Sequence, residues 1–317
     1  MINEIIENIN TIRESAKNSN VSVYDILKLS GCTVLFDEEM KNHTTIKIGG
    51  KVPVFVQPES VDAACSALLL LKPEKPLILG NGSNILVDDK GLDKTVFHFG
   101  KSLSKIEFLD DTNVRAYAGT KLTELCNAVC EKGLTGLEFA YGIPGTVGGA
   151  VYMNAGAFDG EVADVLSRVC FLAQDEDFFD ILSSDELDFG YRASRFQRTG
   201  ETILYADFAL KHGDKTKIRV KMDDFMNRRQ TNQPLEYPSA GSVFRRPAGY
   251  FAGQLIEESG LKGYQIGGAK VSEKHAGFII NVDHATCKDV LELIKHIQKV
   301  VLEKYGVTLE TEIKYLK

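Results

Sequence analysis

The chain lacks the features of several protein classes. Its 317 residues contain no long run of Lys or Arg, and the net charge is -7 at pH 7. Proteins that follow nucleic-acid phosphates need a concentrated basic surface, so we expect no nucleic-acid partner. The six cysteines occur without a C-x-x-C pair, which is unlike a disulfide framework or a zinc site. We therefore expect a reducing, cytoplasmic location and no bound metal.

Long apolar segments are also absent. The most apolar short run, residues 67–71, is far shorter than the roughly 20 residues that cross a bilayer. The first 20 residues carry Glu4, Glu7 and Glu14 among apolar side chains and lack the pattern of a signal peptide. We expect neither membrane insertion nor secretion.

What is present is the composition of a globular protein, with 44% hydrophobic and 26% charged residues. At this length one apolar core is close to its upper size, so two or three subdomains with a cleft are expected. Residues 1–40 predict a helical extension, because apolar side chains recur at helical spacing. These side chains are Ile2, Ile5, Ile6, Ile9 and Ile12, followed by Val23, Ile26 and Leu27.

The body of the chain then alternates between strand and helix patterns. Short β-like runs at 51–58 and 75–80 flank a helical stretch over 60–71, which indicates an alternating α and β unit. Near the end, Thr286 and Asp289 have the spacing of a near-match to a capping box before an apolar stripe. Residues 307–316 alternate between apolar and polar, which predicts a final strand.

Two glycine-rich segments are candidates for binding phosphate through main-chain N–H groups. Neither matches a Rossmann fingerprint or a P-loop, and each has a structural alternative: a turn that ends a strand, or close packing of a turn. The first segment is Gly80, Asn81, Gly82, Ser83, Asn84 and Ile85. The second is Gly142, Ile143, Pro144, Gly145, Thr146, Val147, Gly148 and Gly149.

Three further segments carry side chains capable of chemistry: 190–195, 238–244 and 309–312. Taken singly, each also fits a solvated Arg, a Ser in a turn or a wet Glu face. The chain has no G-x-S-x-G or H-E-x-x-H motif, which argues against a serine hydrolase and a zinc peptidase. His284 and Cys287 stand three positions apart but supply only two metal ligands.

Taken together and in order, these segments resemble the UDP-N-acetylenolpyruvoylglucosamine reductase family. The resemblance covers nearly everything after residue 40 and combines several long motifs, which is more specific than any one of them. The matching segments are 42–50 (NHTTIKIGG), 80–87 (GNGSNILV), 136–158, 191–196 (YRASRF), 233–247 (QPLEYPSAGSVFRRP), 253–281 and 309–313 (LETEI).

The resemblance implies an α+β fold that binds FAD in the manner of the vanillyl-alcohol oxidase (PCMH) group. The implied parts are the extension 1–40, FAD-binding subdomains at 41–100 and 101–219, the latter with strand 306–317, and a substrate subdomain at 220–305. The implied activity is NADPH-dependent reduction of UDP-N-acetylglucosamine enolpyruvate to UDP-N-acetylmuramate through bound FAD, by a monomer. Peptidoglycan precursor synthesis, and through it cell shape and division, is the implied role.

The same resemblance assigns roles to residues. Ser242 matches the general acid, and Arg192 and Glu312 match groups that polarise the substrate carboxylate. Asn154, Tyr191 and Gly241 are implied substrate contacts, and residues 80–85 and 142–149 are implied FAD contacts. Two alternatives stay open. The chain can be another flavin oxidase or dehydrogenase on the same FAD-binding fold, or a catalytically silent module that binds a flavin or a nucleotide sugar.

The chain also departs from the family pattern. Only 50 positions separate Arg192 from Ser242, as in the shorter branch of the family, which lacks a tyrosine-bearing lid. Asn232 stands where relatives carry Lys, and Arg246 stands where longer relatives carry Asn. The family's diphosphate contacts are therefore not transferred to these positions. Because the chain has no Trp, no tryptophan emission overlaps a flavin signal.

Overall fold

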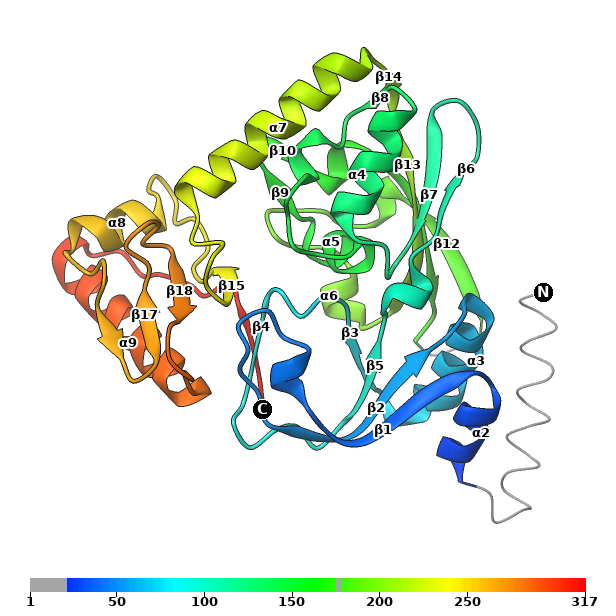
Figure 1. Cartoon of the computed structure of the whole chain (residues 1–317), viewed down its shortest axis with the longest axis horizontal. Helices are drawn as coiled ribbons and strands as arrows, with labels where there is room; N and C mark the ends of the chain where they lie inside the picture. Colours follow the sequence, from blue (N-terminus) through cyan, green and yellow to red (C-terminus); the bar gives the residue numbers. More distant parts are fainter. Residues whose placement is uncertain (1–21, 175–177) are drawn as a thin grey trace. The chain divides into compact units, whose positions relative to one another are not determined.

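The computed structural model describes residues 22–174 and 178–317, and they divide into two units with separate apolar cores (Figure 1). The first unit contains residues up to Phe36, then Val54–Asn81 and Lys94–Met226. The second contains Asp37–Pro53, Gly82–Asp93 and Asn227–Lys317. Both units contain β-sheets and α-helices, which confirms the predicted α+β class.

A four-stranded sheet with the order β1-β2-β5-β3 follows the N-terminal helix α2. Strands β2 and β3 both run parallel to β5, and the apolar run of β2 is largely buried, as parallel strands usually are. The helix after β2 agrees with the helical stretch predicted over 60–71. It begins after Ser60 because the Ser60 hydroxyl caps it by accepting from the Ala63 N–H at 3.1 Å. The elements are α2 (Val23–Leu29), β1 (Cys32–Glu39), β2 (Lys51–Pro58), α3 (Val61–Leu71), β3 (Leu77–Leu79) and β5 (Thr95–His98).

The extension is described only in part. Helix α2 agrees with the predicted helical spacing, and the predicted helix over Ile2 to Ile12 lies outside the described residues. The prediction of a helical extension up to residue 40 is wrong at its end, because Cys32–Glu39 form the strand β1 beside β2.

A five-stranded antiparallel sheet with the order β12-β11-β13-β7-β6 forms the rest of the first unit's core. Helix α5 packs against β13 and β7, so the glycine-rich turn before α5 lies close to this sheet (Figure 1). Its strands are β6 (Ile106–Phe108), β7 (Asn113–Tyr117), β11 (Leu166–Leu172), β12 (Phe179–Ser183) and β13 (Thr202–Ala209). The other elements are α4 (Leu122–Glu131), β8 (Leu134–Thr135), α5 (Val147–Met153), β9 (Gly156–Ala157), β10 (Gly160–Glu161), α6 (Phe196–Thr199), β14 (Lys211–His212) and α7 (Lys215–Asn232).

The second unit is built on a four-stranded antiparallel sheet, β15-β18-β17-β16, against which helix α9 packs. The predicted capping box of α9 is confirmed: the Thr286 hydroxyl accepts from the Asp289 N–H at 3.1 Å, and Asp289 accepts from the Thr286 N–H at 2.9 Å. The elements are β4 (Ile85–Val87), β15 (Ser239–Ser242), α8 (Ala252–Glu258), β16 (Gln265–Ile266), β17 (Ala269–Val271), β18 (Phe278–Asn281), α9 (Cys287–Tyr305) and β19 (Lys314–Leu316).

The C-terminal segment differs from the sequence-based expectation. Only β19 is a regular strand, and it pairs in parallel with β4 of the second unit, whereas the sequence grouped 306–317 with residues 101–219. Thr311 and Tyr315, expected on the apolar face, are exposed. The strand is shorter than predicted because β4 offers only three residues for pairing. The residues before β19 instead bond to the main chain around Val243.

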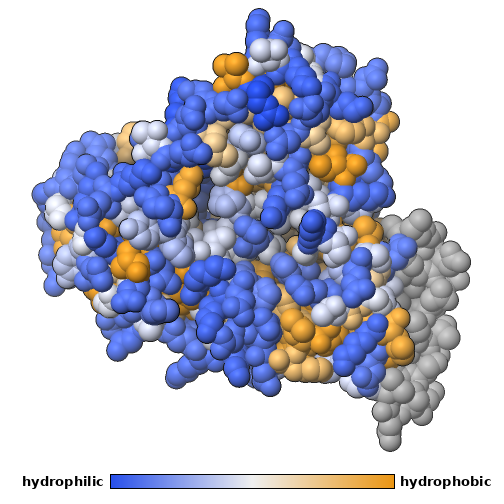
Figure 2. Space-filling view, in the orientation of Figure 1, coloured by the Kyte–Doolittle hydropathy of each residue, from blue (hydrophilic) through white to orange (hydrophobic). Residues whose placement is uncertain are grey.

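One face of the described residues is largely polar (Figure 2), and their cysteines are buried. The face shown in Figure 2 is mostly hydrophilic, with apolar side chains in separate small patches. No helix within residues 22–174 and 178–317 is long and apolar enough to cross a membrane. All six cysteines are buried free thiols, and the described residues contain no cluster of three or more potential metal ligands among His, Cys, Asp and Glu.

Candidate active site

The glycine-rich turn before α5 contains a buried hydroxyl without a partner. The Thr146 side chain is buried, and its Oγ1 finds no hydrogen-bond partner among the residues described. A Cβ added to Gly80 would lie 2.5 Å from this oxygen, so only glycine leaves the space beside it open. Since a buried hydroxyl is costly unless it is hydrogen-bonded, the site fits a ligand with an acceptor oxygen, such as a phosphate.

The same turn does not offer all its N–H groups to a ligand. The interpretation of the whole turn as a set of exposed donors is wrong for four residues, which bond within the chain. The Ile143 N–H donates to the Ala140 carbonyl at 3.0 Å and the Gly145 N–H to that of Ile143 at 2.8 Å. The Val147 N–H donates to the Thr120 carbonyl at 2.8 Å and the Gly148 N–H to that of Ala118 at 3.0 Å. Gly148 is also needed for packing, because a Cβ there would lie 2.9 Å from the Ala118 Cβ. The structural alternative thus holds for Gly148.

Asn81 joins the two glycine-rich segments within the first unit. Its side-chain amide donates to the Pro144 carbonyl at 2.7 Å, which holds the end of the first segment against the second. Gly80, Asn81 and the turn at 142–149 are therefore brought together by the fold.

The rest of the first segment, from Gly82 to Ile85, belongs to the second unit. Gly82 has a φ of +61°, and a Cβ there would lie 2.1 Å from the His43 carbonyl oxygen, so glycine is required on both counts. Asn84 connects this segment to a predicted catalytic residue: its amide donates to the Glu312 carbonyl at 3.3 Å. Its own carbonyl accepts from the Lys314 N–H at 3.0 Å.

Arg192 lies in a tight turn of the first unit. The N–H of Gly190 donates to the carbonyl of Ala193 and the reverse bond is also present, both at 3.1 Å. Arg192 is the third residue of this turn and has a φ of +53°, a position that favours Gly or Asn. Its guanidinium packs over the half-exposed Tyr191 ring, 5.0 Å from the ring centroid.

The Arg192 side chain also donates hydrogen bonds to main-chain carbonyl groups. Arg192 Nη2 donates to the Gly156 carbonyl at 2.7 Å, and Nη1 to that of Asn154 at 3.5 Å. Asn154 is fully buried, and its amide is used inside the protein: Nδ2 donates to the Gly190 carbonyl at 3.1 Å, and Oδ1 accepts from the Ala163 N–H at 3.0 Å. The Asn154 side chain therefore supports the turn that carries Arg192.

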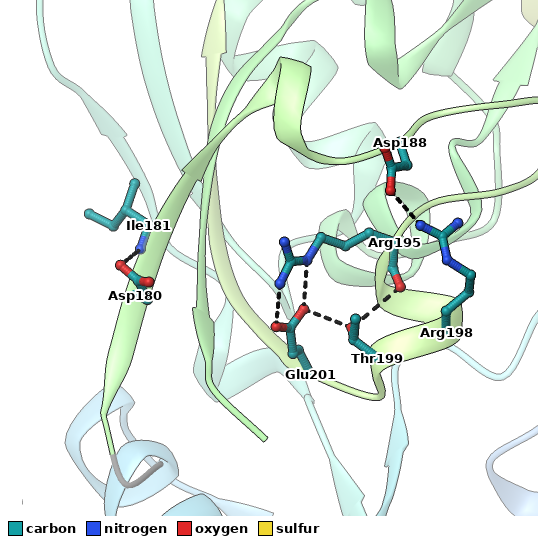
Figure 3. A network of polar contacts seen from close by, with 7 residues as sticks. All are labelled: Asp180, Ile181, Asp188, Arg195, Arg198, Thr199 and Glu201. Carbon is teal, nitrogen blue, oxygen red and sulfur yellow. Dashed lines mark hydrogen bonds and ion pairs between the residues drawn. The ribbon is translucent and has the colours of Figure 1, made fainter. Parts of the chain in front are cut away.

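A second arginine of the same motif has a structural part. Arg195 forms a two-point ion pair with Glu201, at 2.7 and 3.0 Å, and Thr199 donates to the same carboxylate at 2.7 Å (Figure 3). Burial raises the pKa of Glu201, but the hydrogen bonds from Arg195 and Thr199 outweigh it and hold the pKa below its ordinary value. Arg198 pairs with Asp188 at the edge of this network. The network anchors the loop on both sides of Arg192.

In the second unit, main-chain bonds bring the segments of Ser242 and Glu312 together. The N–H of Val243, the residue after Ser242, donates to the Gly277 carbonyl at 2.9 Å. The Val243 carbonyl in turn accepts from the Glu312 N–H at 2.7 Å. Gly241, with a φ of +74°, precedes Ser242, and a Cβ there would meet nothing within 4 Å. Both predicted catalytic side chains are half-buried.

The surroundings of Glu312 are basic. The pKa of the half-buried Lys314 ammonium is lowered by burial first and by Arg245 second, while Glu312 acts in the opposite direction.

The sequence did not identify one residue that organises this region. The Thr45 hydroxyl donates to the Ser239 carbonyl at 2.6 Å, and the Thr45 N–H donates to the Gly82 carbonyl at 3.2 Å. Thr45 thereby connects the segment that leads to Ser242 with the glycine-rich segment. Its place in the motif 42–50 was the available signal, but the motif alone gave no role.

Known proteins match the chain over most of its length. A family model described as the C-terminal domain of UDP-N-acetylenolpyruvoylglucosamine reductase matches residues 233–316, and an FAD binding domain model matches 52–179. A UDP-N-acetylenolpyruvoylglucosamine reductase of Geobacillus kaustophilus is 48% identical over 89% of this chain and 93% of its own length. One of Alkaliphilus oremlandii is 48% identical over 89% of this chain and 92% of its own length.

A solved structure agrees with this assignment. The crystal structure of UDP-N-acetylenolpyruvylglucosamine reductase from Thermus caldophilus covers 90% of this chain and 99% of its own, with a TM-score of 0.75 and 34% identity. Together with the FAD-binding match, this confirms the predicted FAD-binding fold. The chain therefore belongs to the UDP-N-acetylenolpyruvoylglucosamine reductase family.

Proposed function

We propose that Arg192, Ser242 and Glu312 are the catalytic residues of this chain in the reaction of its family, the NADPH-dependent reduction of UDP-N-acetylglucosamine enolpyruvate to UDP-N-acetylmuramate. One observation carries the proposal: the bond of 2.7 Å from the Glu312 N–H to the Val243 carbonyl. It connects the segment of the proposed carboxyl group to the residue that follows the proposed acid. Because main-chain atoms make this bond, it does not depend on either side chain.

The residues of the glycine-rich segments fit FAD. The unpartnered Thr146 hydroxyl and the open space beside Gly80 suit a phosphate oxygen of the cofactor, and Asn81 keeps the two segments in contact. When bound, FAD carries the hydride from NADPH to the substrate. The proposed cofactor contacts are Gly80, Asn81, Gly82, Ser83, Asn84, Ile85, Gly142, Ile143, Pro144, Gly145, Thr146, Gly148 and Gly149.

The chemistry explains why these three catalytic side chains are needed. Addition of a hydride to the terminal carbon of the enol ether moves the π electron pair to the carbon that bears the carboxylate. A positioned cation stabilises this charge, and Arg192 supplies it. The Ser242 hydroxyl gives its proton to the same carbon and regains one from water. Glu312 assists Arg192 in polarising the carboxylate, and NADPH is oxidised to NADP⁺.

The substrate contacts and the setting of the reaction are also part of the proposal. We assign Tyr191 and Gly241 to the substrate, and we assign Asn154 to the turn beneath it, as its internal hydrogen bonds support. The net charge of -7 supports a protein without a nucleic-acid partner. The scattered, buried free thiols support a reducing cytoplasm. We propose a monomer with the extension at 1–40, FAD-binding subdomains at 41–100 and 101–219, and a substrate subdomain at 220–305. Residues 306–317 are no longer grouped with 101–219, because β19 pairs with β4 of the second unit.

The experiment separates the two halves of the reaction. The FAD-loaded protein is reduced with one equivalent of NADPH without oxygen, and the enolpyruvyl sugar nucleotide is then added while the flavin band is followed. For Ser242→Ala we expect an unchanged rate of bleaching and a recovery that is about 10²- to 10⁴-fold slower, since one positioned proton donor is lost. Ser239→Ala, in the same strand, is the matched control and should recover at the normal rate.

Two other outcomes would contradict the proposal. Equal losses in bleaching and recovery would remove the acid role from Ser242. Bleaching without any recovery in the unmodified protein would remove the proposed substrate.

A further inference from the structure

A strained hairpin lies directly beneath Arg192. Strands β9 and β10 pair Gly156 with Glu161 and Ala157 with Gly160, which leaves Phe158 and Asp159 as the two central residues of the turn. Both have positive φ angles, +51° and +63°. Such turns favour Asn and Gly, because a side chain at positive φ crowds its own main chain. A bulky Phe in this position is an outlier that the rest of the structure must maintain.

What maintains Phe158 is a stack with an aromatic side chain of helix α7. The rings of Phe158 and Phe225 lie face to face, with centroids 4.3 Å apart and planes 6° apart. Phe225 is almost fully buried, and the Lys221 ammonium lies 5.8 Å from the centre of its ring. The half-buried Phe158 therefore ties the tip of the hairpin to a helix surface that is itself fixed.

The hairpin is also confined beside its tip. Gly160 directly follows the two turn residues, and a Cβ added there would lie 2.8 Å from the Phe139 ring, so the main chain of the hairpin already touches the body of the first unit. With Phe158 stacked and Gly160 in contact, the Gly156 carbonyl has little freedom. This carbonyl is the acceptor for Arg192 Nη2 at 2.7 Å.

We propose that Phe158, through its stack on Phe225, is a positioning residue for Arg192. The stack fixes the hairpin, the hairpin fixes the Gly156 carbonyl, and the carbonyl orients the guanidinium toward the substrate carboxylate. The inference rests on the proposed role of Arg192. A displacement of about 1 Å at a catalytic group can cost about 10²-fold in rate, so a small shift of the hairpin has a large kinetic effect.

The decisive variant is Phe158→Asn, because Asn suits the turn but cannot stack. If Phe158 only maintains the turn and does not position Arg192, this variant folds, and its rates of reduction by NADPH and of oxidation by the substrate stay normal. If Phe158 positions Arg192, we expect the oxidation of the NADPH-reduced protein by the enolpyruvyl sugar nucleotide to be about 10- to 100-fold slower. The rate of reduction by NADPH should stay within about twofold, and Phe158→Tyr, which keeps the stack, should restore both rates.

A second variant removes the stack from the other side. Phe225→Leu keeps an apolar side chain beneath the hairpin and leaves the turn sequence intact, so it should show the same selective slowing. Tyr264→Leu is the matched control: it removes the stack of Tyr264 on His296 in the second unit, with centroids 4.2 Å apart, and should leave both rates unchanged. Thermal unfolding of each variant reports whether the first unit remains folded.

A double-mutant cycle with Arg192→Ala separates this inference from the proposed function. If Phe158 acts through Arg192, adding Phe158→Asn to Arg192→Ala causes no further slowing. Full additivity, or normal oxidation of Phe158→Asn and Phe225→Leu while Arg192→Ala is impaired, would overturn the inference alone. Normal oxidation of Arg192→Ala would overturn the role of Arg192, and the inference with it.

Discussion

The turn that carries Arg192 and the segments that carry Ser242 and Glu312 reach their geometry by different means. In the first, an L-residue adopts a φ of +53°, and the side chain bonds to two carbonyl groups. In the second, main-chain bonds join Glu312 to Val243 and Val243 to Gly277, neither the Ser242 nor the Glu312 side chain takes part in them, and the residue with positive φ before Ser242 is a glycine. Side-chain substitution should therefore affect folding at Arg192 but mainly chemistry at Ser242 and Glu312.

The largest expected effect is on turnover. Glu312→Gln should lower the rate of substrate reduction by about 10²-fold or more, because the carboxylate that assists Arg192 is lost. Its free energy of unfolding should change by less than about 0.5 kcal/mol, since the main-chain bonds remain. Steady-state kinetics and thermal unfolding measure both. The exposed Glu310→Gln on the same segment is the control, and a large loss of stability in Glu312→Gln would remove the contrast between the two regions.

The next effect concerns the ion pair that anchors the Arg192 loop. Glu201→Gln should reduce the free energy of unfolding by about 1.5–3 kcal/mol at neutral pH, because hydrogen bonds to a charged, largely buried group are lost. The pKa of Glu201 is lower in the folded protein, so its contribution is complete above the unfolded pKa and disappears as pH falls through the folded pKa. The difference in unfolding free energy between the two proteins should therefore shrink as pH falls below the ordinary pKa of Glu, about 4.3. A difference that stays constant down to pH 3 would contradict this.

Strain at Arg192 gives a smaller effect. Both Arg192→Ala and Arg192→Gly lose the hydrogen bonds of the guanidinium, but only Gly accepts positive φ without crowding. We expect the Gly variant to be about 1 kcal/mol more stable than the Ala variant, as measured by denaturant unfolding. Equal stabilities would show that the turn relaxes freely once the side chain is removed.

The smallest effect tests the side-chain contact of the second unit. Thr45→Val removes the hydroxyl that donates to the Ser239 carbonyl at 2.6 Å, which should cost about 1 kcal/mol of unfolding free energy. Thr45→Ser keeps the hydroxyl and should lie close to the unmodified protein. If Thr45→Val is neutral, this side-chain bond does not hold the segment of Ser242 in place, and the contrast with Arg192 becomes sharper.

Local sequence predicted the parts of the fold that local chemistry decides. The helix over 60–71, the Thr286 cap and the strand at 51–58 follow from hydrogen-bonding side chains and hydrophobic pattern. The final strand was predicted too long, because its length depends on the three residues that β4 offers as a partner. No local pattern could show this limit.

The candidate site divides in the same way. Motif order identified the segments of Ser242 and Glu312, and the structure shows the main-chain bond that joins them through Val243. The positive φ angles of Phe158 and Arg192 oppose local preference, so tertiary contacts alone could reveal them. The role of Gly148 could not be predicted, because a glycine allows either close approach of a ligand or close packing of the main chain. The close approach of Ala118 in the structure shows that packing requires glycine here.

The positions of the buried thiols allow local unfolding of each unit to be followed by the reactivity of its own cysteines. Cys287 is the cysteine of the second unit, whereas the other five, such as Cys65, belong to the first. Burial is the main cause that raises the pKa of the Cys65 and Cys287 thiols to about 12. Both thiols therefore react slowly with alkylating reagents while the unit that contains them is folded. Pulsed alkylation followed by peptide mass analysis would therefore time the local unfolding of each unit separately, without tryptophan and without a fluorescent label.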